Sequence, residues 1–173
     1  MAWEAIQPAH TDGTRRVGVR FFQCTIPRRR DPEGMDQRVN VITLGVADVP
    51  RSRAFYEALG WRLTFTDGDI VMFQAGPMVV SLWGRSKLAE DSGVEEPPPG
   101  WGGFTLGYAV SGPADVDALC QQAAAAGASV TRSPVDKPFG YSGVFADPDG
   151  HTWEVAYVEA LTLHDDGTVA LPS

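Results

Sequence analysis

The sequence predicts an α+β fold built from two βαβββ modules, and three observations support this prediction. An apolar, β-branched run followed by a proline that can open a helix occurs twice, at 39–50 and at 103–113. Each helical segment ends at a glycine, and each is followed by three short apolar runs separated by turn residues. The repeat has a period of about 65 residues. We expect the modules to pair into a cup-shaped mixed β-sheet with the helices on its outer face, and a small ligand would lie in the cup.

The first module covers residues 39–84. Its first strand is predicted at 39–49, where apolar and β-branched residues are concentrated. Its helix is predicted over 51–60, where apolar residues recur at helical spacing before Gly60. The remaining strands of this module are predicted at 61–66, 69–75 and 78–84.

Residues 85–102 are predicted to be a linker, because prolines and glycines are concentrated near its end in 95-EEPPPGWGG-103. The second module covers 103–158 and repeats the pattern of the first. Its first strand is predicted at 103–112 and its helix at 114–127. The remaining strands of this module are predicted at 128–135, 141–147 and 151–159.

The two ends of the chain lack this pattern. Residues 1–38 show no clear periodicity and are interpreted as a poorly ordered N-terminal extension, although the apolar stretch 17–26 could add a strand to a sheet edge. The basic run 28–30 is interpreted as solvated. Residues 159–173 are predicted to be a polar C-terminal tail.

Composition limits the classes of partner. The formal net charge is −8, whereas nucleic-acid-binding proteins normally carry a basic face, so no nucleic-acid partner is expected. No apolar run is long enough to span a bilayer, and no secretory signal precedes the patterned region. Cys24 and Cys120 do not form a disulfide framework. We therefore expect a cytoplasmic protein with no membrane partner.

The helix start 48-DVPRSRAFYEALGW-61, the closing segment 147-DPDGHTWEV-155 and the repeat together resemble the vicinal oxygen chelate superfamily. This superfamily contains glyoxalase I, extradiol dioxygenases, fosfomycin-modifying enzymes and bleomycin-binding resistance proteins. The resemblance covers residues 39–158 and implies the glyoxalase/bleomycin resistance fold and a homodimer. It does not imply one reaction, because its members share a fold and differ in chemistry.

In metal-using members, four strand positions that face the cup supply the metal ligands. The resemblance maps these positions onto Val41, Ser81, Thr105 and Glu154. Divalent transition metals are typically held by three or more His, Asp, Glu or Cys side chains, and of the four only Glu154 is such a ligand. His151 is interpreted as a strand-end residue. The resemblance therefore implies no complete metal site and no cofactor.

Glu154 has no obvious structural role. It alternates with Trp153, Val155 and Tyr157, so it is expected on the sheet face opposite to theirs. If those apolar residues pack under the helix, Glu154 faces the cup. There it could anchor a ligand, act as a general base, or pair with an arginine without a role in binding.

Two aromatic residues are predicted to line the same space. Trp83 shares strand parity with Ser81, and Tyr141 lies in a glycine-rich loop, 138–143, that could border the cup. An aromatic lining would suit a planar or hydrophobic organic ligand. Alternatively, the aromatic residues fill the cup or form a dimer interface.

The sequence favours a protein that binds a small organic molecule in the cup without a full metal site, as bleomycin-resistance-type proteins do. The residues expected to contact the ligand are Val41, Ser81, Trp83, Thr105, Tyr141 and Glu154. The alternative is a divalent-metal-dependent lyase, isomerase or dioxygenase that uses Glu154 as a ligand. A third interpretation is a structural or regulatory subunit whose cup is filled. Whether catalysis occurs stays open, and no catalytic residue is assigned.

Overall fold

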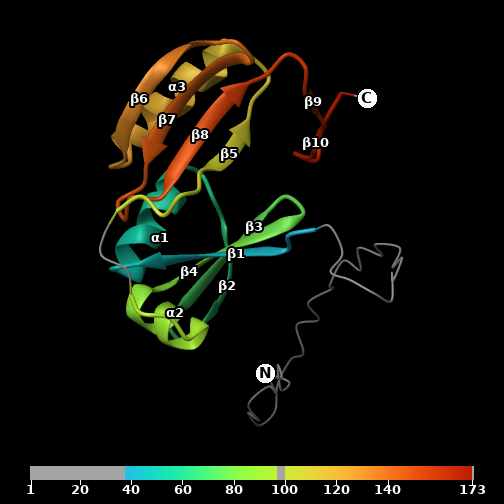
Figure 1. Ribbon diagram of the computed structural model, residues 1–173. Helices are drawn as coiled ribbons and strands as arrows, with labels where there is room; N and C mark the ends of the chain where they lie inside the picture. The colour runs from blue at the N-terminus through green and yellow to red at the C-terminus, as the bar shows by residue number, and fades with distance from the viewer. Residues whose placement is uncertain (1–37, 97–99, 173) are drawn as a thin grey trace, which may run out of the picture. The chain divides into compact units, whose positions relative to one another are not determined.

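The computed structural model describes residues 38–96 and 100–172, and Figure 1 shows their arrangement. The fold is mixed α+β, with two four-stranded mixed sheets and three helices in the described part of the chain. The stretch 17–26, the basic run 28–30 and Cys24 lie outside the described residues. No helix in the described ranges is long and apolar enough to cross a bilayer.

The first module has the predicted βαβββ order. Its sheet contains β1 (Val41–Val46), β2 (Leu63–Asp67), β3 (Ile70–Ala75) and β4 (Met78–Gly84), arranged β1-β4-β3-β2. β1 runs parallel to β4, and the other neighbours are antiparallel. The helix α1 (Val49–Ala58) connects β1 to β2. This helix begins at Asp48, whose carboxylate accepts a hydrogen bond from the Arg51 backbone N–H at 2.9 Å, and Pro50 lies in its first turn.

The second module repeats the first. Its sheet contains β5 (Leu106–Ala109), β6 (Ser129–Lys137), β7 (Gly140–Ala146) and β8 (Thr152–Tyr157), arranged β5-β8-β7-β6. α3 (Pro113–Ala125) connects β5 to β6. The chain leaves this helix through Gly127, whose φ of +107° is a left-handed conformation that favours glycine.

Two parts of the structure lie in segments where no element was predicted. The short helix α2 (Arg85–Ser92) occupies the first half of the predicted linker. The predicted tail contains two paired strands, β9 (Thr162–Leu163) and β10 (Val169–Ala170). The helix is short and mainly polar, and strands of two residues are too short to show a period.

The two modules share one hydrophobic core. The ring of Phe55 on α1 lies 6.4 Å from that of Phe145 on β7, and the ring of Tyr56 lies 6.1 Å from that of Trp153 on β8. The side chain of Gln122 on α3 donates a hydrogen bond to the carbonyl of Ala58 at the end of α1. The helix-covered faces of both sheets therefore contribute to the same core.

Each sheet has a second face, which we call its open face. The core-facing residues of β4 are Val80 and Leu82, so Ser81 belongs to the open face of the first sheet. The core-facing residues of β8 are Trp153 and Val155, so Glu154 belongs to the open face of the second sheet. Within the described residues no strand of one sheet pairs with a strand of the other, so the open faces belong to separate sheets.

Candidate functional site

Three of the predicted site residues lie on the open face of the first sheet. The register places Val41 beside Val79, and Ser81 between Thr43 and Met72. Ser81 is buried, whereas Val41 is exposed on the edge strand. Trp83 is half-buried on the same face, as its parity with Ser81 predicted.

The helix α2 covers part of this open face. Trp83 lies opposite Gly45 of β1 in the register. A β-carbon on Gly45 would lie 3.3 Å from Cδ2 of Leu88 and 3.4 Å from Cα of Arg85, both on α2. The first turns of α2 therefore pack against β1 next to Trp83, and a ligand on this face would meet α2 at its border.

Glu154 forms a polar centre on the open face of the second sheet. Arg132 of β6 donates to its Oε1 at 2.9 Å, and the hydroxyl of Ser142 on β7 donates to the same oxygen at 3.0 Å. The Arg132 guanidinium also contacts the Ser142 carbonyl at 2.8 Å and its hydroxyl at 2.9 Å. The side chains of Arg132 and Glu154 are 29% and 34% exposed. Glu154 therefore pairs with an arginine, which is one of the roles considered for it. Both charged groups are partly exposed to solvent.

Thr105 and Tyr141 form their hydrogen bonds with other residues than those of this polar centre. Thr105 precedes β5, and its hydroxyl lies 2.9 Å from that of Thr152 at the start of β8. Tyr141 donates a hydrogen bond to Asp117 of α3 at 3.0 Å, so its hydroxyl points to the helix-covered side of the sheet. This hydrogen bond raises the pKa of Tyr141, so the hydroxyl stays a donor at neutral pH.

The four positions mapped from metal-using relatives do not fit a divalent cation. Val41 has no donor atom, Ser81 and Thr105 offer hydroxyls, and Glu154 is bound by Arg132 and Ser142. Across residues 38–96 and 100–172, no three or more His, Cys, Asp and Glu side chains gather in a way that could hold a metal ion.

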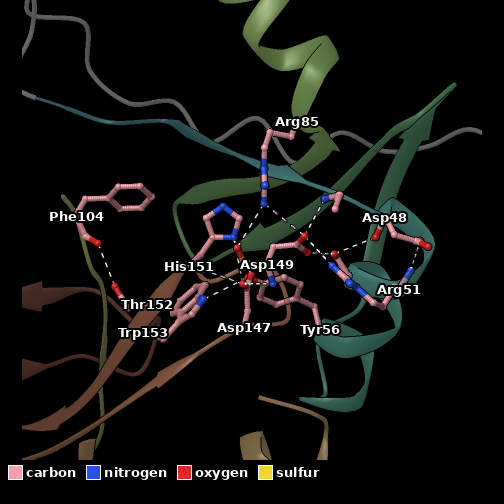
Figure 2. Close-up of polar contacts among 12 residues, drawn as sticks. Asp48, Arg51, Tyr56, Arg85, Phe104, Asp147, Asp149, His151, Thr152 and Trp153 are labelled. Carbon is pink, nitrogen blue, oxygen red and sulfur yellow. Dashed lines mark hydrogen bonds and ion pairs between the residues drawn. The ribbon is translucent and has the colours of Figure 1, made fainter. Parts of the chain in front are cut away.

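A second polar cluster joins the modules, and the predicted site did not include it (Figure 2). We call it the junction network. The carboxylate of Asp149, only 1% exposed, accepts hydrogen bonds from the Ala47 backbone N–H at 2.8 Å and the Arg51 guanidinium at 2.7 Å. The Ser52 hydroxyl donates to its other oxygen. The turn before β8 is thereby fixed to the first turn of α1.

Asp147 is the buried centre of the same network. Its carboxylate accepts hydrogen bonds from the backbone N–H of His151 at 2.9 Å and from the Tyr56 hydroxyl at 2.8 Å. The Nδ1 atom of His151 lies 3.0 Å from Oδ2 of Asp147. The indole N–H of Trp153 donates to the Tyr56 oxygen at 3.2 Å. Within the described residues, every buried side-chain nitrogen and oxygen has a partner.

These contacts shift two ionisations. Burial acts to raise the pKa of Asp147, but the hydrogen bonds from His151 and Tyr56 and the charge of His151 outweigh it, so the pKa of this carboxyl is lowered. Burial, followed by the Asp147 charge, raises the pKa of Tyr56 far above its ordinary value. At neutral pH Asp147 is therefore the acceptor and Tyr56 a protonated donor.

A sequence signal for the junction network was present. Asp147 precedes the turn Pro148-Asp149-Gly150, which comes directly before a buried strand, and aspartates in such turns bond nearby backbone N–H groups. The partners on α1 lie about 95 residues away in the sequence, and only the tertiary structure brings them to the turn.

The fold agrees with comparisons to known proteins. The model of the glyoxalase/bleomycin resistance protein/dioxygenase superfamily matches residues 38–155. The chain belongs to this superfamily. No curated protein matches the sequence significantly.

Solved structures of superfamily members are similar to this chain. The crystal structure of a glyoxalase-related enzyme from Fulvimarina pelagi is 34% identical, with a TM-score of 0.74, over 79% of this chain and 99% of that chain. A superfamily protein from Nocardioides is 24% identical, with a TM-score of 0.59, over 72% of this chain and 85% of its own. A lactoylglutathione lyase from Agrobacterium tumefaciens is 20% identical, with a TM-score of 0.56, over 70% and 93% of the two chains. The last two similarities support the fold alone.

Proposed function

We propose that this superfamily member binds a small organic molecule on its open faces without a divalent metal. The observation that carries the proposal is the polar centre of Arg132, Ser142 and Glu154. In the metal-using relatives, the position of Glu154 supplies a metal ligand. Here the Arg132 guanidinium balances the charge of the Glu154 carboxylate, so a metal cation is not needed to balance it.

The polar centre suits recognition of a polar group on an otherwise apolar ligand. Val144 lies directly beside Glu154 in the register, and Val135 lies beside Ser142 on the same open face. Small-molecule sites commonly combine an apolar lining with a few convergent polar groups. A ligand would exchange hydrogen bonds with the exposed edges of Arg132 and Glu154 and place its apolar part against the valines.

We further propose that a homodimer completes the site. The open faces belong to separate sheets, so the predicted contacts at Ser81, Trp83 and Glu154 would meet only if a second copy brought the two kinds of face together. Each open face carries exposed apolar side chains, namely Val41, Phe65 and Val135. Exposed apolar side chains on a sheet face can contribute to such an interface. We place the dimer in the cytoplasm.

A metal-dependent lyase, isomerase or dioxygenase is the second candidate. An enzymatic function is favoured by the 34% identity between this chain and the glyoxalase-related enzyme from Fulvimarina pelagi. The donor set at Val41, Ser81, Thr105 and Glu154 does not favour it. We therefore give preference to metal-independent binding.

The test is a thermal-shift screen of the full-length protein against small organic compounds. A compound that binds the folded protein raises its melting temperature by mass action. The hits should be compared between the wild type and Arg132→Gln. Arg62→Gln is the matched control, because Arg62 is exposed on the loop before β2 and is not part of the polar centre.

We expect hits whose stabilisation is lost in Arg132→Gln and kept in Arg62→Gln. Hits that stabilise all three proteins equally would place the ligand elsewhere and would contradict the proposal.

A further inference from the structure

A cavity of about 310 Å³ lies next to the junction network, and we call it the junction cavity. Its walls come from β1, from α2, from the segment before β5 and from the turn before β8. None of the six predicted ligand-contacting residues lines it. Its volume is at the lower end of the range for small-molecule sites.

One wall presents the imidazole of His151. The Nδ1 atom of this ring lies 3.0 Å from the Asp147 carboxylate, so in the neutral ring Nδ1 carries the proton and donates it to Asp147. The other ring nitrogen, Nε2, is then an acceptor with a free lone pair. The buried carboxylate thus fixes both the tautomer and the orientation of the ring.

The His151 side chain is 15% exposed, and this residue lines the junction cavity. Among residues 38–96 and 100–172 its Nε2 atom has no hydrogen-bond partner, whereas His151 uses Nδ1 and its backbone N–H. In the same ranges, every fully buried side-chain nitrogen or oxygen has a hydrogen-bond partner. Nε2 therefore reaches the molecular surface, and we infer that it does so in the junction cavity, which His151 lines.

Arg85 supplies the second polar group of the cavity wall. Its guanidinium lies 3.8 Å from Oδ1 of Asp149 and 3.5 Å from the Asp149 carbonyl, and Figure 2 shows it extending from α2 toward the turn that contains His151. The Asp149 carboxylate is already bound by Arg51, Ser52 and the Ala47 N–H. The positive charge of Arg85 can therefore act on a further oxygen in the cavity.

The rest of the wall is mainly apolar. Leu88 and Ala89 project from α2, and Val94 follows that helix. Trp101 and Phe104 precede β5 and are exposed aromatic side chains. Such a wall favours an apolar, planar body, while Nε2 and Arg85 fix one polar group.

We propose that the junction cavity binds a small, mainly apolar molecule that carries one hydroxyl group, of which a phenol is the simplest example. The hydroxyl donates to Nε2 of His151, and its oxygen faces Arg85. The ring packs against Leu88, Trp101 and Phe104. The cavity lies at the border of the first open face, between β1 and α2. It shares no residue with the polar centre of Arg132, Ser142 and Glu154, so this proposal does not depend on the function proposed for that centre.

The experiment titrates the full-length protein with 4-chlorophenol by calorimetry. The matched probe is 4-chloroanisole, which has nearly the same shape but no hydroxyl donor. We expect the phenol to bind about tenfold more tightly, because only the phenol can satisfy Nε2. Long-range ¹H–¹⁵N spectra of the imidazoles should show a shift of the His151 Nε2 resonance with the phenol alone.

Two variants of α2 test the location. Leu88→Trp fills the cavity and should abolish binding of the phenol. Glu90→Trp places the same side chain on an exposed position of α2 that does not line the cavity, and it should bind the phenol like the wild type. Equal affinity for the two probes, unchanged binding in Leu88→Trp, or no binding of the phenol at millimolar concentration would each overturn the proposal.

Discussion

At the scale of single residues, the acidic side chains near β8 have different roles. Glu154 lies on the open face and shares hydrogen bonds with Arg132 and Ser142, with both charges partly exposed. Asp147 and Asp149 are buried and connect the modules. We expect substitutions at Glu154 to affect ligand binding, and substitutions at Asp147 and Asp149 to affect the stability of the fold.

Asp149→Ala should lower the free energy of unfolding by about 3 kcal/mol, because it leaves the Ala47 N–H, the Ser52 hydroxyl and the Arg51 guanidinium without their acceptor. Urea unfolding followed by tryptophan fluorescence measures this change. Asp91→Ala, on the exposed surface of α2, is the control and should change the free energy by less than about 0.5 kcal/mol. Similar values for the two variants would show that the junction network does not stabilise the fold.

Asp147 should make the fold sensitive to acid. Because its folded-state pKa is lowered, its ionised form stabilises the fold above the unfolded pKa of about 3.9, and this stabilisation is lost as the pH falls through the folded pKa. Tyr56→Phe removes one of the hydrogen bonds that lower this pKa. The variant should therefore lose less unfolding free energy than the wild type between about pH 6 and about pH 2.

Chemical denaturation across this pH range tests the prediction. Tyr141→Phe is the control, since the Tyr141 hydroxyl contacts Asp117 and not Asp147, and it should keep the pH dependence of the wild type. The same pH dependence in Tyr56→Phe as in the wild type would argue against a role for the Tyr56 contact in the ionisation of Asp147.

At the scale of elements, local sequence patterns predicted the long, regular parts. The helices α1 and α3 and the strands of both sheets were predicted from apolar periodicity and from turn residues, with ends displaced by a few residues. The helix α2 was missed because its sequence, RSKLAEDS, contains only Leu88 and Ala89 as apolar residues. Its packing against Gly45 of β1 is a tertiary contact that no local pattern contains.

The strand β7 depends on a glycine where it passes α3. A β-carbon on Gly143 would lie 2.7 Å from Sγ of Cys120 and 3.0 Å from Cγ of Pro134. Gly143→Ala should therefore lower the unfolding free energy by about 1–3 kcal/mol through overpacking.

A double-mutant cycle with Cys120→Ala measures the cause. Removing the sulfur makes room for the new methyl group, so the cost of Gly143→Ala should shrink in the Cys120→Ala background. Gly107→Ala, on β5, is the control, because its β-carbon would meet no atom within 4 Å. A cost of Gly143→Ala that is unchanged by Cys120→Ala would exclude this contact as the cause.

At the scale of the whole molecule, the repeat predicted the family and the fold class, and these are confirmed. The site was harder to predict. Strand parity placed Ser81, Trp83 and Glu154 on open faces, but it could not show that the sheets are separate or that Arg132 binds Glu154. The pairing of the strands and the contact between Arg132 and Glu154 depend on the tertiary structure, which the parity of a single strand does not contain.

If the open faces form the homodimer interface, a charged side chain introduced on an open face should weaken the dimer. The full-length protein should sediment as a dimer at micromolar concentration, and Val41→Lys should weaken the dimer by about tenfold or more, because Val41 is exposed on the open face of β1. Val169→Lys introduces the same charge at an exposed valine of β10 and should leave the dimer intact. A monomeric wild type would remove the basis for a shared site.

The metal content of the full-length protein tests the central claim, metal-independent ligand binding, most directly. The protein should be purified without a histidine tag or a chelator and measured by elemental mass spectrometry beside Glu154→Ala. The account predicts no stoichiometric zinc, nickel, manganese or iron in either protein. A stoichiometric metal in the wild type that is lost in Glu154→Ala would contradict it and would favour a metal-dependent enzyme.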